Sequence, residues 1–212
     1  DTTAAEQTAS NTLQSFTSTG FTVGVSSGVN DSSSTYVAWC WKVGGGTTST
    51  NSNGSLNTTV QANQDAGVSI IKYDMNVTSA SAFTIGHGLS AAPELVFFFS
   101  LEQSGQTSNI VYPNNPNKEI PLDSNGAFDA SATSAYWNTT APSSTVINMG
   151  TAWGQYSSYY GGDTIAYAFH SVDGFSKIGS YTGNGSTNGP IVETGFEPAF
   201  LMVKRTDSTA NQ

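Results

Sequence analysis

The chain has little cysteine and little charge, and both shortages exclude classes of protein. Cys40 is the single cysteine, so an intrachain disulfide, a thiolate zinc cluster and a CxxC redox pair cannot form. Six basic side chains against 15 acidic ones give a net charge of -9, which repels phosphate groups. We therefore expect neither a nucleic-acid partner nor an anionic membrane surface as a partner, and we expect stability to come from packing.

Long apolar runs and helical patterns are also missing. The longest apolar run, residues 95–99, is far shorter than the roughly 20 residues that span a bilayer as a helix. No window repeats apolar residues with the period of an amphipathic helix. We therefore expect little helix and no membrane span.

What is present is a series of short β-branched or aromatic segments between clusters of Gly, Asn, Ser and Pro. Such a series is typical of an all-β sandwich or barrel. The predicted strands are residues 21–25, 36–42, 68–73, 82–85, 94–101, 146–149, 164–170, 176–181, 191–194 and 199–204. The predicted fold class is all-β, with antiparallel sandwich modules of the jelly-roll or lectin-like kind.

The sequence also repeats itself. Residues 37–42 and 165–170 share one alternation of large and small side chains, so that Ala38 and Cys40 match Ala166 and Ala168. Because side chains of a strand alternate between two faces, both segments have a large face and a small face. Four further matches follow in the same order, namely 21–24 with 147–150, 68–71 with 175–178, 88–89 with 195–196, and 93–96 with 198–201.

The repeat predicts two related β-sandwich modules, unless it reflects chance similarity between generic strands. The first is residues 1–103, with a Gly-, Ser- and Thr-rich loop or linker at 43–66, and the second is residues 132–212. Residues 104–131 are predicted to be a variable loop or linker. We expect both ends of the chain to be cut from a longer polypeptide.

Four segments carry a resemblance to a known family: 20–24, 35–42, 85–89 followed by 92–94, and 179–185 followed by 198–200. They resemble a repeated domain of unknown function found in virion structural proteins of tailed phages, particularly marine ones. The resemblance covers most of the chain and departs at 109–130. It implies a structural place in a virion and brings no catalytic residues with it.

Motifs that could carry chemistry are weak. Residues 24–28 fit GxSxG, but no helix is predicted after the serine, so a Gly/Ser loop is the better interpretation. His87 lies between two glycines and His170 ends a strand, and neither has metal ligands at suitable spacing. We therefore predict no catalytic residue, no metal site and no cofactor.

The aspartates offer a second possible chemistry. A glycan-cleaving enzyme needs two carboxyl groups across the scissile bond, and a calcium site needs several carboxylates. Each candidate lies in a predicted loop, where aspartate commonly caps turns. The candidates are Asp31, Asp65, Asp123, Asp129, Asp163 and Asp173.

An aromatic cluster in residues 153–162 is the candidate ligand-binding site. Flat rings with polar edges suit contacts to a sugar or a protein. Alternatively, the rings cover the end of the sandwich or pack against a neighbouring subunit. The residues are Trp153, Tyr156, Tyr159 and Tyr160.

Together these features predict a non-enzymatic structural protein on the exterior of a phage virion, assembled in the bacterial cytoplasm. It would be a tail fibre segment or a capsid fibre or decoration. The expected partners are other virion proteins, copies of itself in a homotrimer, and a host-surface glycan. The alternative is a carbohydrate-binding lectin-like module, secreted or particle-borne. A glycan-cleaving enzyme is a third, less favoured hypothesis.

Overall fold

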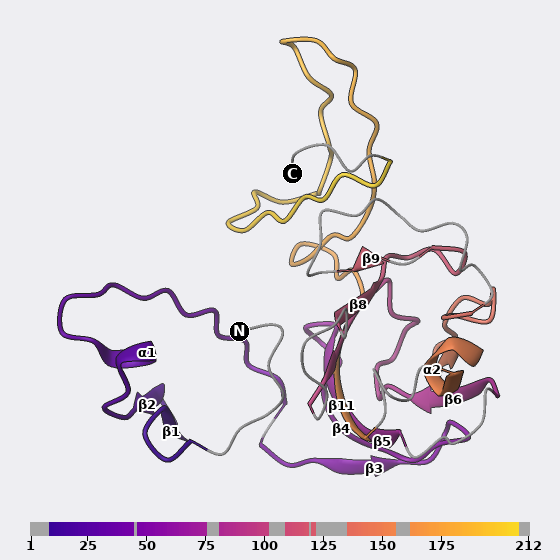
Figure 1. The fold of residues 1–212 in the computed structure, drawn as a ribbon. Helices are drawn as coiled ribbons and strands as arrows, with labels where there is room; N and C mark the ends of the chain where they lie inside the picture. Colours follow the sequence, from indigo (N-terminus) through magenta and orange to yellow (C-terminus); the bar gives the residue numbers. More distant parts are fainter. Residues whose placement is uncertain are drawn as a thin grey trace. The chain divides into compact units, whose positions relative to one another are not determined.

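The computed structural model describes residues 9–44, 46–75, 81–101, 109–118, 120–121, 135–155 and 162–207 (Figure 1). The chain divides into two compact units, one of Glu6–Lys42 and one of Asp1–Ala5 with Val43–Gln212. The helices are short, α1 at Ser27–Asn30 and α2 at Thr151–Gln155. The prediction of a mainly antiparallel β protein with little helix is therefore confirmed. In the part that the structure describes, no helix is long and apolar enough to cross a membrane.

The smaller unit is a hairpin followed by an irregular segment. Strands β1 (Leu13–Phe16) and β2 (Phe21–Val23) pair antiparallel, with Phe16 opposite Phe21. Strand β2 confirms the first three residues of the strand predicted at 21–25, and α1 follows it. Both strands are exposed along their whole length, so this hairpin has no core of its own.

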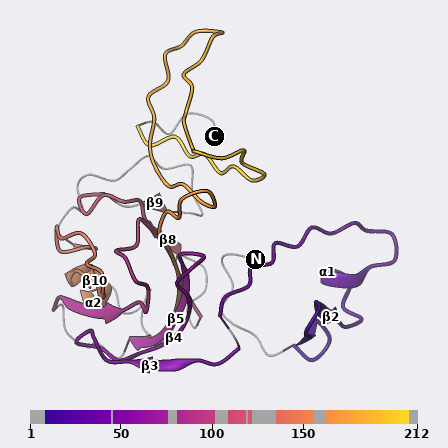
Figure 2. The same ribbon diagram turned by 180° about the vertical axis from the view of Figure 1, so that it is seen from behind.

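The larger unit is built on a seven-stranded antiparallel sheet in the order β3-β4-β5-β11-β7-β8-β9 (Figures 1 and 2). Strand β11 is central because it pairs with β5 on one side and β7 on the other. The strands are β3 (Ser49–Asn51), β4 (Thr58–Asn63), β5 (Val68–Met75), β7 (Leu95–Ser100), β8 (Asn109–Tyr112), β9 (Ile120–Pro121) and β11 (Gly162–Phe169).

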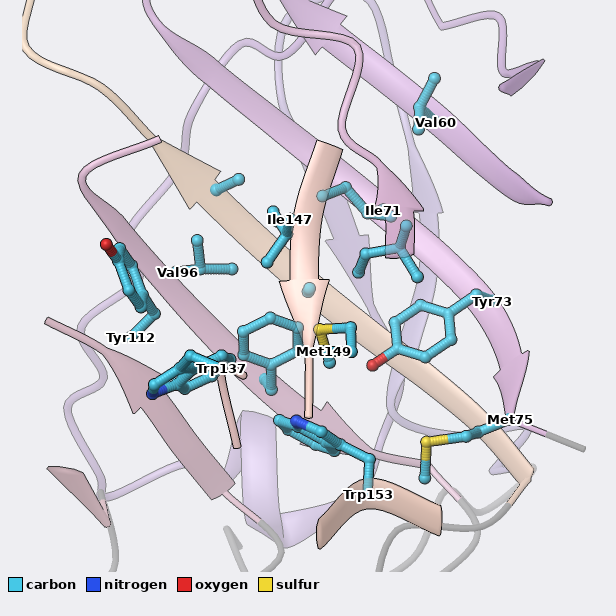
Figure 3. Close-up of a cluster of buried hydrophobic side chains, with 14 of the residues drawn as sticks. Val60, Ile71, Tyr73, Met75, Val96, Tyr112, Trp137, Ile147, Met149 and Trp153 are labelled. Carbon is cyan, nitrogen blue, oxygen red and sulfur yellow. The ribbon is translucent and has the colours of Figure 1, made fainter. Parts of the chain in front are cut away.

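A second, two-stranded layer covers one face of this sheet. Strands β6 (Phe83–Gly86) and β10 (Val146–Met149) pair antiparallel, with Ile85 opposite Ile147. Ile85 and Ile147 are fully buried in one cluster with residues of the large sheet, and Figure 3 shows β10 passing over that sheet. The core of the protein thus lies between the two layers.

The prediction of a loop or linker at 43–66 was wrong, because β3 and β4 lie in it. Strand β4 has the sequence TTVQAN, whose polar composition hides the alternation of a strand. Thr58 and Val60 are nevertheless buried, and β4 pairs with β5 from Thr59 to Asn63. A sheet neighbour supplied the backbone hydrogen bonds that composition alone does not reveal.

Four predicted strands are absent from the described residues as strands: 36–42, 176–181, 191–194 and 199–204. Each has the β-branched or aromatic composition of a strand. A strand also needs hydrogen bonds from a neighbour, and these segments have no ladder partner in the part of the chain that the structure describes. Only Ser176 takes part in a bridge, to Val172.

The boundary between the two repeat copies is not a boundary between sheets. Strands β5 and β7 come from residues 1–103, whereas β11 comes from residues 132–212, and all three are neighbours. Strands β6 and β10 are divided in the same way. The folded sandwich therefore combines part of each repeat copy.

Candidate interaction surface

The central strand β11 presents a small face to the core and a large face outwards. Ala166 and Ala168 are fully buried and lie opposite Phe98 and Val96 of β7. Both alanines belong to the buried cluster that also contains Trp137 and Trp153, and close packing in such a core restricts the volume of each side chain. The alternation predicted for residues 165–170 is thus present, with the small face inside.

The outward face of the same strands carries half-buried aromatic rings. Phe169 meets Phe97 of β7 edge to face, with ring centroids 6.0 Å apart, and Tyr167 meets Phe99 in the same manner at 5.8 Å. Such pairs stabilise neighbouring strands beyond the area they bury. Burial also raises the pKa of the Tyr167 phenol, so the ring is neutral at physiological pH.

Trp153, the first residue of the predicted ligand-binding cluster, lies in the core. Its ring is 1% exposed and packs against Phe98 and Trp137 at centroid distances of 5.1 and 5.8 Å (Figure 3). Its indole Nε1–H donates to the carbonyl oxygen of Tyr136 at 2.9 Å. The polar edge and both faces of the indole are therefore used inside the protein.

This placement corrects the sugar-contact role considered for Trp153, since a stacking ring must be accessible. Helix α2 turns the indole inwards, and the sequence pattern of an aromatic next to glycine does not show that direction. Tyr156, Tyr159 and Tyr160 lie outside the described residues. Trp137, which sequence reasoning did not select, is equally buried and donates to the Lys118 carbonyl oxygen at 2.7 Å.

His87 is a structural histidine. Leu89 donates its backbone N–H to Nδ1 at 3.1 Å, and Nε2 lies 3.2 Å from the Ser143 carbonyl oxygen, so Nε2 carries the proton. Burial lowers the pKa of the His87 imidazole and the Ser143 carbonyl opposes this shift. The ring thus connects β6 to the loop before β10 as a neutral group.

The glycines on either side of His87 meet different constraints. Gly88 has φ +72°, a left-handed conformation that favours glycine. A Cβ on Gly86 would collide with the Asn51 side chain. The Gly-His-Gly sequence therefore ends β6 with a backbone conformation and a close contact that both favour glycine.

The other motifs also have structural uses. Ser26 of the GxSxG pattern does precede a helix, contrary to expectation, and its hydroxyl accepts from the Gly28 N–H at 3.4 Å as the N-cap of α1. The two histidines of the chain, His87 and His170, both lie outside the segment 9–42 that contains Ser26. Asp31 accepts from the Ser33 and Ser34 hydroxyls at 3.3 and 3.1 Å in a turn.

Asp163 was predicted to be in a loop but lies in β11, where its carboxylate pairs with Lys72 of β5 at 2.7 Å. Asp123 and Asp129 are outside the described residues. Over the described ranges no three His, Cys, Asp or Glu side chains are grouped so that they could hold a metal ion.

Comparison with known proteins assigns the chain to a family. The family model described as "Domain of unknown function (DUF7483)" matches residues 1–212. The chain belongs to this family. No curated protein and no solved structure matches it.

In this member of the family, large apolar side chains are exposed in two of the predicted strands that have no ladder among the described residues. Trp39 is 67% exposed and Trp41 61%. Leu201 is 76% exposed, and the neighbouring Phe200 and Met202 are also exposed. Contiguous exposed apolar side chains mark interaction sites on soluble proteins. These two segments, residues 36–41 of the smaller unit and residues 200–203 of the larger unit, are two separate candidate interaction surfaces.

Proposed function

We propose that this chain is a non-enzymatic structural segment of a tailed-phage virion, in a tail fibre or in a capsid fibre or decoration. The observation that carries the proposal is the sharing of one sheet by two copies of a sequence repeat. Repeat-built proteins extend by adding units that contact their neighbours, which suits a fibre or a coat. The resemblance of residues 20–24 and 35–42 to virion domains supports the location.

The residues considered for chemistry favour a structural role as well. His87 and Ser26 are held by backbone groups, and Trp153 fills the core. A nucleophile or a general base must instead be free to meet a substrate. Both interaction surfaces are apolar, which suits protein assembly better than the binding of a polar sugar.

The test is quantitative mass spectrometry of virions purified from the sample that encodes the chain. Peptides of the chain are counted against the major capsid protein. A few copies in multiples of three would support a fibre, and hundreds of copies would support a decoration. Absence of the chain from intact particles, with the capsid protein well covered, would overturn the virion assignment.

A further inference from the structure

The folded sandwich shows how the repeat is used. Its strands β5, β6 and β7 belong to the first repeat copy, and β10 and β11 belong to the second. Strand β11 pairs with β5 and β7, and β10 pairs with β6. Every ladder between repeat-matched strands therefore joins one repeat copy to the other.

Two repeat-matched pieces of the chain, one near each end, contribute no strand to the folded sandwich. The amino-terminal half, residues 21–42, matches β10 and β11, whereas the carboxy-terminal half, residues 175–205, matches β5, the residues that follow β6, and β7. The two terminal pieces therefore correspond to the two sets of strands from which the folded sandwich is made. In the described residues their apolar side chains are largely exposed, as at Val37 (73%) and Ile191 (86%).

We propose that the carboxy-terminal half of one copy of this chain joins the amino-terminal half of a second copy to complete another sandwich. The order of the halves argues for a second copy. In the folded sandwich, the half with β5, β6 and β7 precedes the half with β10 and β11 along the chain. Within one chain, the terminal piece that matches β10 and β11 comes first, so the order is reversed. When two copies are placed head to tail, the carboxy-terminal piece of one copy precedes the amino-terminal piece of the next, and the order of the folded sandwich is restored.

The register follows from the folded sheet. Strand β11 lies opposite β7 with Ala168 at Val96 and Ala166 at Phe98. Moved to the matching segments, this register places Cys40 opposite Leu201 and Ala38 opposite Val203. The full set of opposed pairs is Tyr36 with Arg205, Val37 with Lys204, Ala38 with Val203, Trp39 with Met202, Cys40 with Leu201, and Trp41 with Phe200.

The side chains suit this register. Ala166 and Ala168 on β11, with Val96 and Phe98 on β7, are 0% exposed. Their counterparts Ala38, Cys40, Leu201 and Val203 are small or apolar and would share one face in the same way, because faces alternate along a strand. Pairing of this kind gains backbone hydrogen bonds and buries alternate side chains, as in strand addition.

The charge distribution permits the contact. Residues 1–42 carry three acidic and one basic side chain, and residues 171–212 carry four acidic and three basic ones. Residues 43–170, which include every strand of the folded sandwich, carry eight acidic and two basic ones. The halves that must meet are thus nearly neutral, so like-charge repulsion between copies opposes the pairing only weakly.

The junction is tested by disulfide cross-linking of the full chain. Leu201→Cys places a second thiol opposite the native Cys40, and mild oxidation should join copies because opposed residues of antiparallel strands have Cβ atoms within disulfide reach. Met202→Cys is the matched control, because its side chain points to the other face. We expect at least a tenfold higher cross-linked yield for Leu201→Cys than for Met202→Cys.

A mixing experiment identifies the partner. One copy keeps Cys40 without a second thiol, and the other carries Cys40→Ala with Leu201→Cys and a larger tag. Cross-linked dimers that contain one copy of each size in the mixture support the proposal. So do ladders or closed trimers formed by the Leu201→Cys variant alone. A link formed only within single chains overturns the second-copy assignment. Equal yields for Leu201→Cys and Met202→Cys, or no link with either, overturn the pairing itself.

Unfolding of the reduced variants by urea shows that each retains the folded sandwich. Because Cys40, Leu201 and Met202 are all outside that sandwich, its unfolding midpoint should be the same in every variant.

Discussion

Residues 162–169 and residues 36–41 differ more in surroundings than in sequence. Both alternate large and small side chains in the same phase. The first segment is the centre of a seven-stranded sheet, and the second has no ladder among the described residues. Ala168 is 0% exposed, whereas Trp39 is 67% exposed. The comparison teaches that this pattern forms a strand at residues 162–169, where two neighbouring strands supply hydrogen bonds and a second layer covers the small face, and that the pattern alone does not form one at residues 36–41.

The largest effect should come from a charge placed on the small face. Ala168→Asp puts a carboxylate between the two layers, and Cys40→Asp is the same change at the matching position. We expect Ala168→Asp to lower the free energy of unfolding of the sandwich by about 4 kcal/mol or more, because the ion would be buried without a partner. Cys40→Asp should leave it within about 0.5 kcal/mol.

Urea unfolding followed by tryptophan fluorescence measures both variants. Equal stability of the two aspartate variants would remove the distinction between the segments.

A second comparison sets two tryptophans against each other. Trp153→Ala should lower the free energy of unfolding by about 3–5 kcal/mol, because it removes a buried indole that contacts Phe98 and Trp137. Trp39→Ala should change the free energy of unfolding of the sandwich by less than about 0.5 kcal/mol, because its ring is exposed. The midpoint and slope of urea unfolding at constant pH give both values. A small cost for Trp153→Ala would mean that its ring is not part of the core.

The pH dependence of stability sharpens the comparison at β6. His87 is buried and its folded-state pKa is lowered, while the matching position in the carboxy-terminal half is Thr194. Below the unfolded pKa of 6.5 the unfolded chain takes up a proton that the folded chain resists. Stability is therefore full above pH 6.5 and decreases as the pH falls further, by at most about 1.4 kcal/mol per pH unit.

The control is His87→Gln, whose amide can donate to Ser143 and accept from Leu89. Urea midpoints between pH 8 and pH 5 should fall less steeply for this variant than for the native chain. Parallel profiles would assign the pH dependence to other groups.

The smallest effect concerns the ion pair between Lys72 and Asp163. Their matching positions, Gly179 and Thr35, carry no charge. Because both side chains are partly exposed, Asp163→Asn should cost only about 0.2–1 kcal/mol, and the loss should shrink at high salt. Thermal unfolding at low and high ionic strength checks this. A cost independent of salt would point to a hydrogen-bonding role instead.

The candidate surfaces were only half visible from the sequence. The alternation at residues 36–42 and 199–204 identified segments able to form strands, and composition identified Trp153 as able to bind a ring-stacking ligand. Whether a given aromatic ring is buried depends on what packs over it. Helix α2 and the core around Phe98 bury Trp153, and the sequence near Trp153 contains no sign of either.

By itself, the sequence determined the fold class, the low helix content, the repeat and the alternation that puts Ala166 and Ala168 on one face. These follow from local preferences and from the period of two along a strand. Only the tertiary structure decided which strands found neighbours, that β4 was one of them, and that one sandwich takes strands from both repeat copies. Pairing is a contact between residues far apart in the chain, so no local pattern can specify it.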